Sequence, residues 1–250
     1  MERIMFEIPF EYDLHTHTKF SDGKSPVDLM VVAAIGNGVK TLAITDHAFD
    51  DAQAEKLLDE YSRIDRSKYP VRLIWGCEAA VKDQSGTPTV RDDLLKRFEL
   101  VLMDCNYILF SKLAKTGLSQ EAMRDLLCNI LIRASANPFV RVMAHPFNFG
   151  IAPLSLPLSL FYDSHVEAVA KAFKANGKVF EIMNMMYFWH SCTAFEEFER
   201  EYLRILRIFQ ANGVQFSVGS DAHCDCGVGA LPWSRKIVDI LGEKDRLFCP

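Results

Sequence analysis

The chain has 250 residues, 49% of them hydrophobic, so it can bury one large core, and we expect a single domain over residues 1–250. The net charge of -5 provides no basic surface for general binding to a nucleic-acid backbone, although a nucleic acid held in a local cleft is not excluded. No apolar run approaches the roughly 20 residues of a membrane-spanning helix, so we expect no membrane contact.

Seven cysteines, an odd number, are spread along the chain. The N-terminus carries Glu2 and Arg3 and lacks the apolar core of a signal peptide, so we expect a cytoplasmic protein with reduced thiols. Cys224 and Cys226 form a Cys-x-Cys pair that is compatible with metal binding. Because no second pair accompanies it, we expect both to be free thiols.

Short β-rich runs alternate with amphipathic stretches along the chain. The runs are nearly continuously apolar, which is typical of parallel strands that are buried on both faces. Seven strands are expected, at Tyr12–Leu14, Thr41–Thr45, Val71–Trp75, Leu100–Met103, Val142–Ala144, Val179–Ile182 and Gln215–Val218.

The stretches between these strands have the periodicity and end signals of helices. Ser25 and Pro26 indicate an N-cap and a first helical position, and the pair Asn212-Gly213 is typical of a helix C-terminus. The other helices are expected at Ala52–Ile64, Leu118–Ala136, Val166–Ala175 and Phe195–Ala211. The repeated strand–helix order predicts a parallel α/β barrel or a doubly wound sheet.

The motif His15-Thr16-His17 follows the first strand. Side chains at i and i+2 of an extended segment point to the same side, so both imidazoles can converge on one divalent metal ion. Other acidic residues and histidines follow the remaining strands, whose C-terminal ends meet on one face of such a fold. They are Asp22, Asp46, His47, Glu78, His145, Glu181, Asp221 and His223.

Each of these residues has an ordinary explanation when it is taken alone. Asp22 precedes a glycine and suits a turn, Asp46 suits a helix cap, and Glu78 suits a solvated loop. Six strand ends that all carry a His, Asp or Glu nevertheless favour a metal site. The set is large enough for two or three ions that share a carboxylate, and such centres are suited to hydrolysing phosphate esters with a metal-activated water.

The order of these residues resembles the PHP (polymerase and histidinol phosphatase) family over essentially the whole chain. The resemblance implies a distorted (β/α)7 barrel, similar to a TIM barrel, with a site for zinc, manganese or iron at its C-terminal face. It rests on Asp13-Leu14-His15-Thr16-His17, Thr45-Asp46-His47, Glu78, Ala144-His145-Pro146, Glu181-x-x-Asn184 and Gly219-Ser220-Asp221-Ala222-His223.

The resemblance also implies three groups of metal ligands. The first ion is assigned to His15, His17, Glu78 and Asp221. The second is assigned to Asp22, His47 and His223, to which we also assign catalytic roles. The third is assigned to His145 and to Glu78, which would bridge two ions.

One position departs from the family pattern. Relatives place a histidine at the end of strand four as a ligand of the third ion, and Asn106 stands there in this chain. Asparagine is a poorer zinc ligand than imidazole. Asp104 and Cys105 are the available substitutes, but strand alternation points Cys105 away from the side that Asp104 and Asn106 share. We therefore expect two tightly bound ions and a third that binds weakly or not at all.

These observations favour a metal-dependent hydrolase of phosphate monoesters or diesters. The expected substrate is a small phosphorylated metabolite, a nucleotide or a short oligonucleotide, with Lys112 and His190 as candidate substrate contacts. One alternative is a metal-binding regulatory or scaffold module with little activity. Another is an amidohydrolase-like metal hydrolase, which is less favoured because Glu78 takes the bridging place that a lysine usually has there. A homo-oligomer is compatible with all three.

Overall fold

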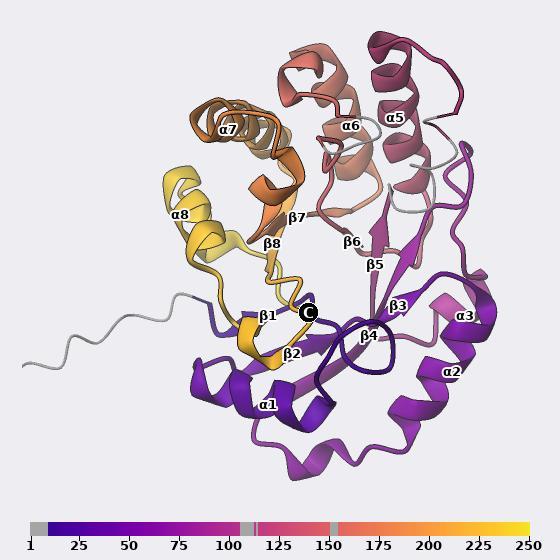
Figure 1. Ribbon diagram of the computed structural model, residues 1–250, viewed down its shortest axis with the longest axis vertical. Coiled ribbons are helices and arrows are strands. Elements are labelled where there is room, and N and C mark those ends of the chain that lie inside the picture. Colours follow the sequence, from indigo (N-terminus) through magenta and orange to yellow (C-terminus); the bar gives the residue numbers. More distant parts are fainter. Residues whose placement is uncertain (1–9, 106–112, 114, 151–154) are drawn as a thin grey trace, which may run out of the picture.

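Parallel strands form the centre of the molecule, and helices lie around them (Figure 1). The computed structural model describes residues 10–105, 113, 115–150 and 155–250. The strands are β1 (Tyr12–Asp13), β2 (Thr41–Ile44), β3 (His47–Ala48), β4 (Arg72–Ala80), β5 (Leu100–Asp104), β6 (Val142–Met143), β7 (Val179–Met183) and β8 (Gln215–Gly219). The helices are α1 (Val27–Gly36), α2 (Asp51–Ser62), α3 (Asp92–Leu95), α5 (Gln120–Ala134), α6 (Asp163–Ala175), α7 (Phe195–Ala211) and α8 (Pro232–Leu241).

The sheet has the order β1-β2-β4-β5-β6-β7-β8, its neighbouring strands are parallel, and the short β3 pairs with β4. Contacts between the last and the first strand nearly close it into a barrel. The backbone N–H of Asp221 donates to His15 O at 2.9 Å, and that of His17 donates to Ala222 O at 2.8 Å. The predicted parallel α/β barrel is therefore confirmed, and the doubly wound sheet, which stays open, is excluded.

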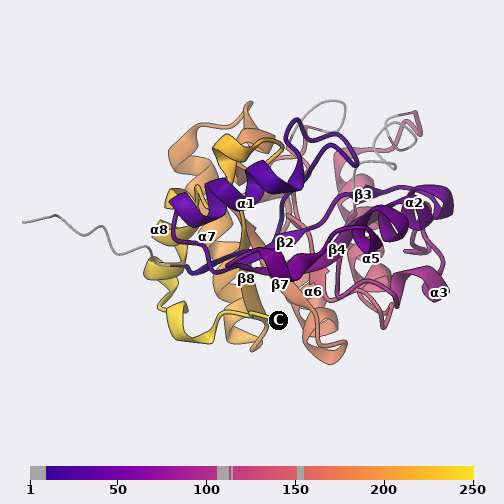
Figure 2. The same cartoon turned by 90° about the horizontal axis from the view of Figure 1, so that it is seen from below.

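Apolar side chains fill the interior of the barrel toward the N-terminal ends of its strands. Phe248 packs against them, and its N–H donates to Phe216 O at 2.7 Å. In Figure 2 the C-terminus lies at the lower edge, opposite the indigo loop that precedes α1. The interior cluster consists of Leu14, Ala43, Ile74, Leu100, Leu102, Val142, Ala144 and Val179.

The alternation of side chains along the strands brings carboxylates into the other end of the barrel. Ile74 belongs to the interior cluster, and Glu78 lies four residues later on the same side of β4. On β7, Val179 belongs to the interior cluster, and Glu181 lies two residues later on the same side of the strand. Both carboxylates are only 1% exposed. Glu78 was expected to follow its strand, but it lies within β4, because pairing with β3 and β5 continues past it.

Some of the helix caps and helix bounds predicted from the sequence are confirmed, and others are wrong. The hydroxyl of Ser119 accepts the N–H of Ala122 and caps α5, and α7 has its predicted bounds. Ser25 was expected to cap α1, but its hydroxyl oxygen accepts the N–H of Asp225 at 3.1 Å instead of an N–H of the helix. The same hydroxyl donates to Asp225 Oδ1 at 2.5 Å, and the two bonds hold it to that segment. Helix α8 was not predicted. Within the described ranges, every helix is too short or too polar to cross a membrane.

The expectation of free thiols at Cys224 and Cys226 is wrong. The turn Asp225–Gly227 brings their Cα atoms to 5.3 Å, within the range of a disulfide, and their sulfur atoms are bonded. Neither sulfur is then available as a metal ligand. The cysteines that are free in the structure include Cys77, Cys105 and Cys128, which are buried.

Gly219 is required where β8 passes the end of β7. A Cβ atom at this position would lie 2.3 Å from Glu181 Oε1 and 2.5 Å from His15 Cβ, and both of those side chains are buried. We expect Gly219→Ala to lower the free energy of unfolding by about 1–3 kcal/mol, as overpacking does. Gly36→Ala is the control, because the structure places no atom within 4 Å of its added Cβ. Urea denaturation compares the two, and equal stability of both variants would contradict this account.

Candidate metal centre

Four side chains meet at the deepest part of the barrel mouth. His15 Nε2 lies 3.3 Å from Glu78 Oε2 and 3.5 Å from Asp221 Oδ1. His17 Nε2 lies 3.6 Å and 3.1 Å from the same two oxygens. His15, His17 and Glu78 are at most 1% exposed. The structure thus brings together the four residues assigned to the first ion, although they come from opposite ends of the chain.

A second group lies at the rim of the barrel and is more exposed. Asp22 Oδ2 is 3.4 Å from His47 Nε2 and 3.3 Å from His223 Nε2. The exposed fractions of these side chains are 55%, 19% and 38%, in that order. One ligand atom from each of them and from His17 fit within 4.8 Å of one another. The residues assigned to the second ion are therefore adjacent, and His17 joins them.

The third group surrounds the other oxygen of Glu78. His145 Nε2 lies 3.1 Å from Glu78 Oε1, and His15 completes a set whose ligand atoms fit within 4.8 Å. Asp104 Oδ1 lies 4.0 Å from His145 Nδ1, so the carboxylate named as a substitute for the missing histidine reaches this group. Asn106 lies outside the described residues, and weak binding of a third ion stays a prediction.

The donor atoms of this cluster fit divalent metal ions. Glu78 Oε1 and Oε2, His15 Nε2 and both ring nitrogens of His17 are buried, and among the described residues none has a hydrogen-bond partner. A buried polar atom without a partner is costly, and a buried carboxylate is especially so. Imidazole and carboxylate ligands suit zinc, manganese and iron. Cations bound between these residues would satisfy the facing oxygens of Glu78 and Nε2 atoms of His15 and His17.

The histidine and carboxylate pKa values show strong electrostatic coupling. Burial alone lowers the pKa of His47, but the neighbouring carboxylates of Asp22 and Glu78 outweigh it and raise the value to about 10. Burial also lowers the pKa of His145, but the neighbouring carboxylate of Glu78 outweighs this effect and raises the value to about 9. Burial raises the pKa of Glu78, but the charge of His15 outweighs it and holds the value well below its usual range. A divalent ion can replace the imidazole protons as the positive partner of these carboxylates.

Glu181 orients the first ligand and was not assigned a role from the sequence. Its Oε1 accepts a hydrogen bond from His15 Nδ1 at 2.8 Å, which leaves Nε2 of that ring facing Glu78. Its Oε2 accepts the backbone N–H of His145 at 2.8 Å. His223 is oriented in the same manner, because its Nδ1 donates to the carbonyl of Asp221 at 2.9 Å. A carboxylate or carbonyl behind a ligating imidazole fixes its tautomer and ring direction.

Asp46 holds the loop that carries Asp22. Its carboxylate accepts the backbone N–H of Thr18 at 2.7 Å, the hydroxyl of Ser21 at 2.6 Å and the hydroxyl of Tyr61 at 3.1 Å. The helix cap considered for Asp46 is supplied by a neighbour instead, because Asp50 accepts the N–H of Gln53. Asp46 therefore links the loop after β1 to α2. The only hint in the sequence was its place directly before His47.

Two of the candidate ligands have strained backbones. His145 and Asp221 have φ values of 29° and 56°, in the left-handed region that side chains other than glycine rarely adopt. Both residues stand where a strand turns into a loop at the barrel mouth. Strain of this kind costs on the order of 1–3 kcal/mol, and it persists at functional sites because the surrounding structure enforces it.

Of the two predicted substrate contacts, the structure describes only His190. His190 is buried in the segment Met186–His190, where its Nε2 donates to Phe147 O at 3.2 Å and its ring stacks on Phe198. Burial lowers its pKa to about 4. Its role in substrate binding stays a prediction, and Lys112 lies outside the described residues.

Comparisons with known proteins agree with this geometry. The sequence profile of the PHP domain matches residues 13–219, which include most of the candidate ligands. The chain belongs to the PHP family. A probable phosphatase of Acetivibrio thermocellus is 30% identical over 94% of this chain and 88% of its own length. A probable phosphatase of Caldicellulosiruptor bescii is 27% identical over 91% and 86%.

A solved structure confirms the fold of this PHP domain. The histidinol phosphate phosphatase of Lactococcus lactis, crystallised with zinc, L-histidinol and phosphate, superimposes with a TM-score of 0.64. The match covers 92% of this chain and 93% of that protein at 14% sequence identity. At this identity the likeness concerns the arrangement of the barrel and not the substrate.

The shared position of Glu78 predicts unequal effects of two conservative substitutions. We expect Asp22→Asn to lose about one equivalent of metal, because Asp22 belongs to one ligand group. Glu78→Gln should lose more than one, because its two oxygens face different groups. Elemental analysis after dialysis against zinc or manganese measures this, with the exposed Glu55→Gln as the control. Equal losses in both variants would contradict a bridging Glu78.

Metal binding should release protons. In the metal-free protein His47 and His145 carry protons at pH 7, because their pKa values are about 10 and about 9. The pKa of His15 is also raised well above its usual value by the carboxylates around it. Since only neutral imidazole binds a metal, we expect release of at least two protons per chain and an affinity that rises with pH. Isothermal titration calorimetry in buffers with different ionisation enthalpies counts the protons. Metal uptake with no proton release would disprove the coupling.

Proposed function

We propose that this protein is a metal-dependent hydrolase of small phosphate monoesters. The observation that carries the proposal is the overlap of the three ligand groups: His15 and His17 each belong to two of them, and Glu78 contacts members of all three. Ions held by shared ligands lie close together, and closely spaced ions are suited to phosphate esters. When bound, they would activate a water molecule and neutralise charge on the phosphoryl oxygens.

The residues at the rim of the centre are in the best position to act on a bound ester. Asp22, His47 and His223 are the exposed members of the cluster, whereas His15 and His17 are sealed from solvent. We assign to the deep residues the holding of the centre and to the rim residues the contact with substrate. Once His47 and His223 hold an ion they are neutral, so the proton that the leaving alkoxide needs would come from a water molecule at the rim.

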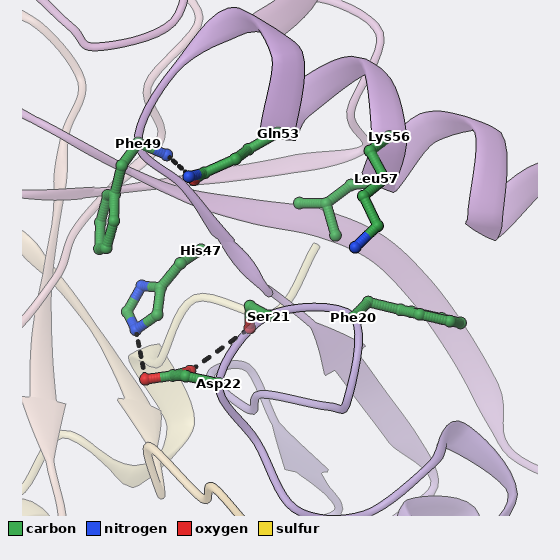
Figure 3. A pocket seen from close by; sticks show the side chains of 8 residues that line it. All are labelled: Phe20, Ser21, Asp22, His47, Phe49, Gln53, Lys56 and Leu57. Atoms are coloured by element: carbon green, nitrogen blue, oxygen red, sulfur yellow. Dashed lines mark hydrogen bonds and ion pairs between the residues drawn. The ribbon is translucent and has the colours of Figure 1, made fainter.

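The space beside the rim favours a small substrate. A pocket of about 310 Å³ opens next to Asp22 and His47 (Figure 3), which is near the lower end of the range for ligand pockets. The net charge of -5 provides no basic surface along which a polynucleotide would bind. The names of the bacterial relatives, probable phosphatases, support the same reaction class. Of the substrates considered, a phosphorylated metabolite or single nucleotide fits better than an oligonucleotide.

A panel of esters tests the proposal. We expect the manganese- or zinc-loaded protein to hydrolyse phosphomonoesters such as phenyl phosphate at least tenfold faster than the diester bis-phenyl phosphate. Chelation should abolish turnover, and added metal should restore it, because the centre supplies the nucleophile. The measurement is phosphate or phenol release. Metal-loaded protein that turns over none of the esters would disprove the proposal and favour a metal-binding regulatory module.

A further inference from the structure

The pocket beside the rim has a second wall, formed by α2, on the side opposite the metal centre. Asp22 and His47 form one side of it, and Gln53, Lys56 and Leu57 reach into it from α2 (Figure 3). A phosphate ester whose phosphoryl group sits at the rim would place its leaving group in this space. The wall on α2 is therefore the part of the chain that meets the leaving group.

The flat apolar surfaces of this pocket are held in place by their neighbours. The ring of Phe49 stacks on His47, with centroids 4.5 Å apart and an interplanar angle of 29°. Phe20 lies edge-on to Tyr61 at 6.0 Å, and Leu57 is only 1% exposed. Such rigid aromatic and aliphatic walls suit the apolar body of a ligand, and a ring in particular.

Lys56 supplies the positive charge of the pocket. Its side chain is exposed, and among the described residues no carboxylate lies within the 4.0 Å of an ion pair. The nearby acids of the same helix are engaged elsewhere, because Asp59 and Glu60 both pair with Arg63. The ammonium is therefore available to a ligand, and Figure 3 shows it across the pocket from Asp22.

The other polar groups of the pocket do not compete for this charge. Asp22 is paired with His47 and His223, and the hydroxyl of Ser21 donates to Asp46. Gln53 Oε1 accepts the backbone N–H of Phe49 at 2.8 Å, which leaves the amide NH₂ of the same side chain as a further donor. The free groups of the wall on α2 are thus a cation and a neutral donor, the pair that an anion requires.

We propose that Lys56 determines the specificity of this enzyme by selecting phosphate esters whose leaving group carries a second anionic group on a flat apolar body. The inference rests on the proposed function, because it takes the rim as the place of the phosphoryl group. A carboxylate or a second phosphate would meet Lys56 and the amide of Gln53, with the ring or chain between Phe20 and Phe49. A leaving group with an ammonium would be repelled.

Phosphonates, which are not hydrolysed, test the charge preference by binding alone. The probes are benzylphosphonate and its 4-carboxy and 4-aminomethyl derivatives, titrated calorimetrically into the metal-loaded full chain. We expect the carboxy compound to bind about five- to tenfold more tightly than the unsubstituted one, as one solvated charge-assisted contact provides. The preference should shrink as ionic strength rises. Equal affinities in the wild type, or no binding of any of the three, would overturn the inference.

Variants of the lysine complete the test. Lys56→Ala should abolish the preference for the carboxy compound over benzylphosphonate, and Lys56→Glu should reverse it toward the aminomethyl compound. The control is Lys96→Ala, an exposed lysine after α3 at the opposite end of the barrel, which should keep the wild-type preference. A preference that survives Lys56→Ala would disprove the assignment.

A parallel measurement separates this inference from the proposed function. The ratio of kcat/KM for 4-carboxyphenyl phosphate to that for phenyl phosphate should match the binding preference and respond to Lys56→Ala in the same way. Hydrolysis of both esters at equal kcat/KM would leave the phosphatase standing and overturn only the role of Lys56. If neither ester is hydrolysed but the binding preference is preserved, the proposed phosphatase activity is disproved and the anion site at Lys56 is supported.

Discussion

A buried carboxylate between imidazoles is the interaction on which the centre of this protein depends. Glu78 Oε2 lies 3.0 Å from His47 Nδ1 and 3.3 Å from His15 Nε2, and its Oε1 lies 3.1 Å from His145 Nε2. A carboxylate that is 1% exposed is stable as an anion only when positive partners surround it. The barrel meets this need because the ends of its strands converge on one point and bring the imidazoles around the carboxylate. The electrostatic stability of the site therefore depends directly on the fold.

The proximity of many candidate ligands could be predicted from the sequence because it obeys local rules. His15 and His17 were expected together from strand alternation, and the strand ends were expected to converge from parallel topology. The parts that were missed depend on contacts between distant segments. Asp46 reaches Thr18 and Tyr61, and the wall on α2 faces a loop near residue 20, so neither relation has a periodic signal. The disulfide of Cys224 was missed for a related reason, because it needs the geometry of one turn.

The cluster is divided between a sealed interior and an accessible rim. The deep ligands are held by Glu181 and by the strained backbones of His145 and Asp221, whereas Asp22 is carried on a loop that Asp46 fixes. In the proposed function, the deep residues retain the ions and the rim residues contact the substrate. Pocket residues beyond the rim can then vary with the substrate without disturbing the deep ligands, which is how barrels of this kind support different specificities.

The closure of the barrel by its first and last strands has a consequence for how the protein is made. The centre needs His15 and His17 from the start of the chain and Asp221 and His223 from near its end, and hydrogen bonds join residues 15 and 221 directly. During synthesis the early residues must therefore remain without these partners until residues 221–223 have left the ribosome. Such distant pairings fold slowly and expose intermediates to misassembly. In the proposed function, the complete centre can therefore bind metal only after residue 223 has been synthesised.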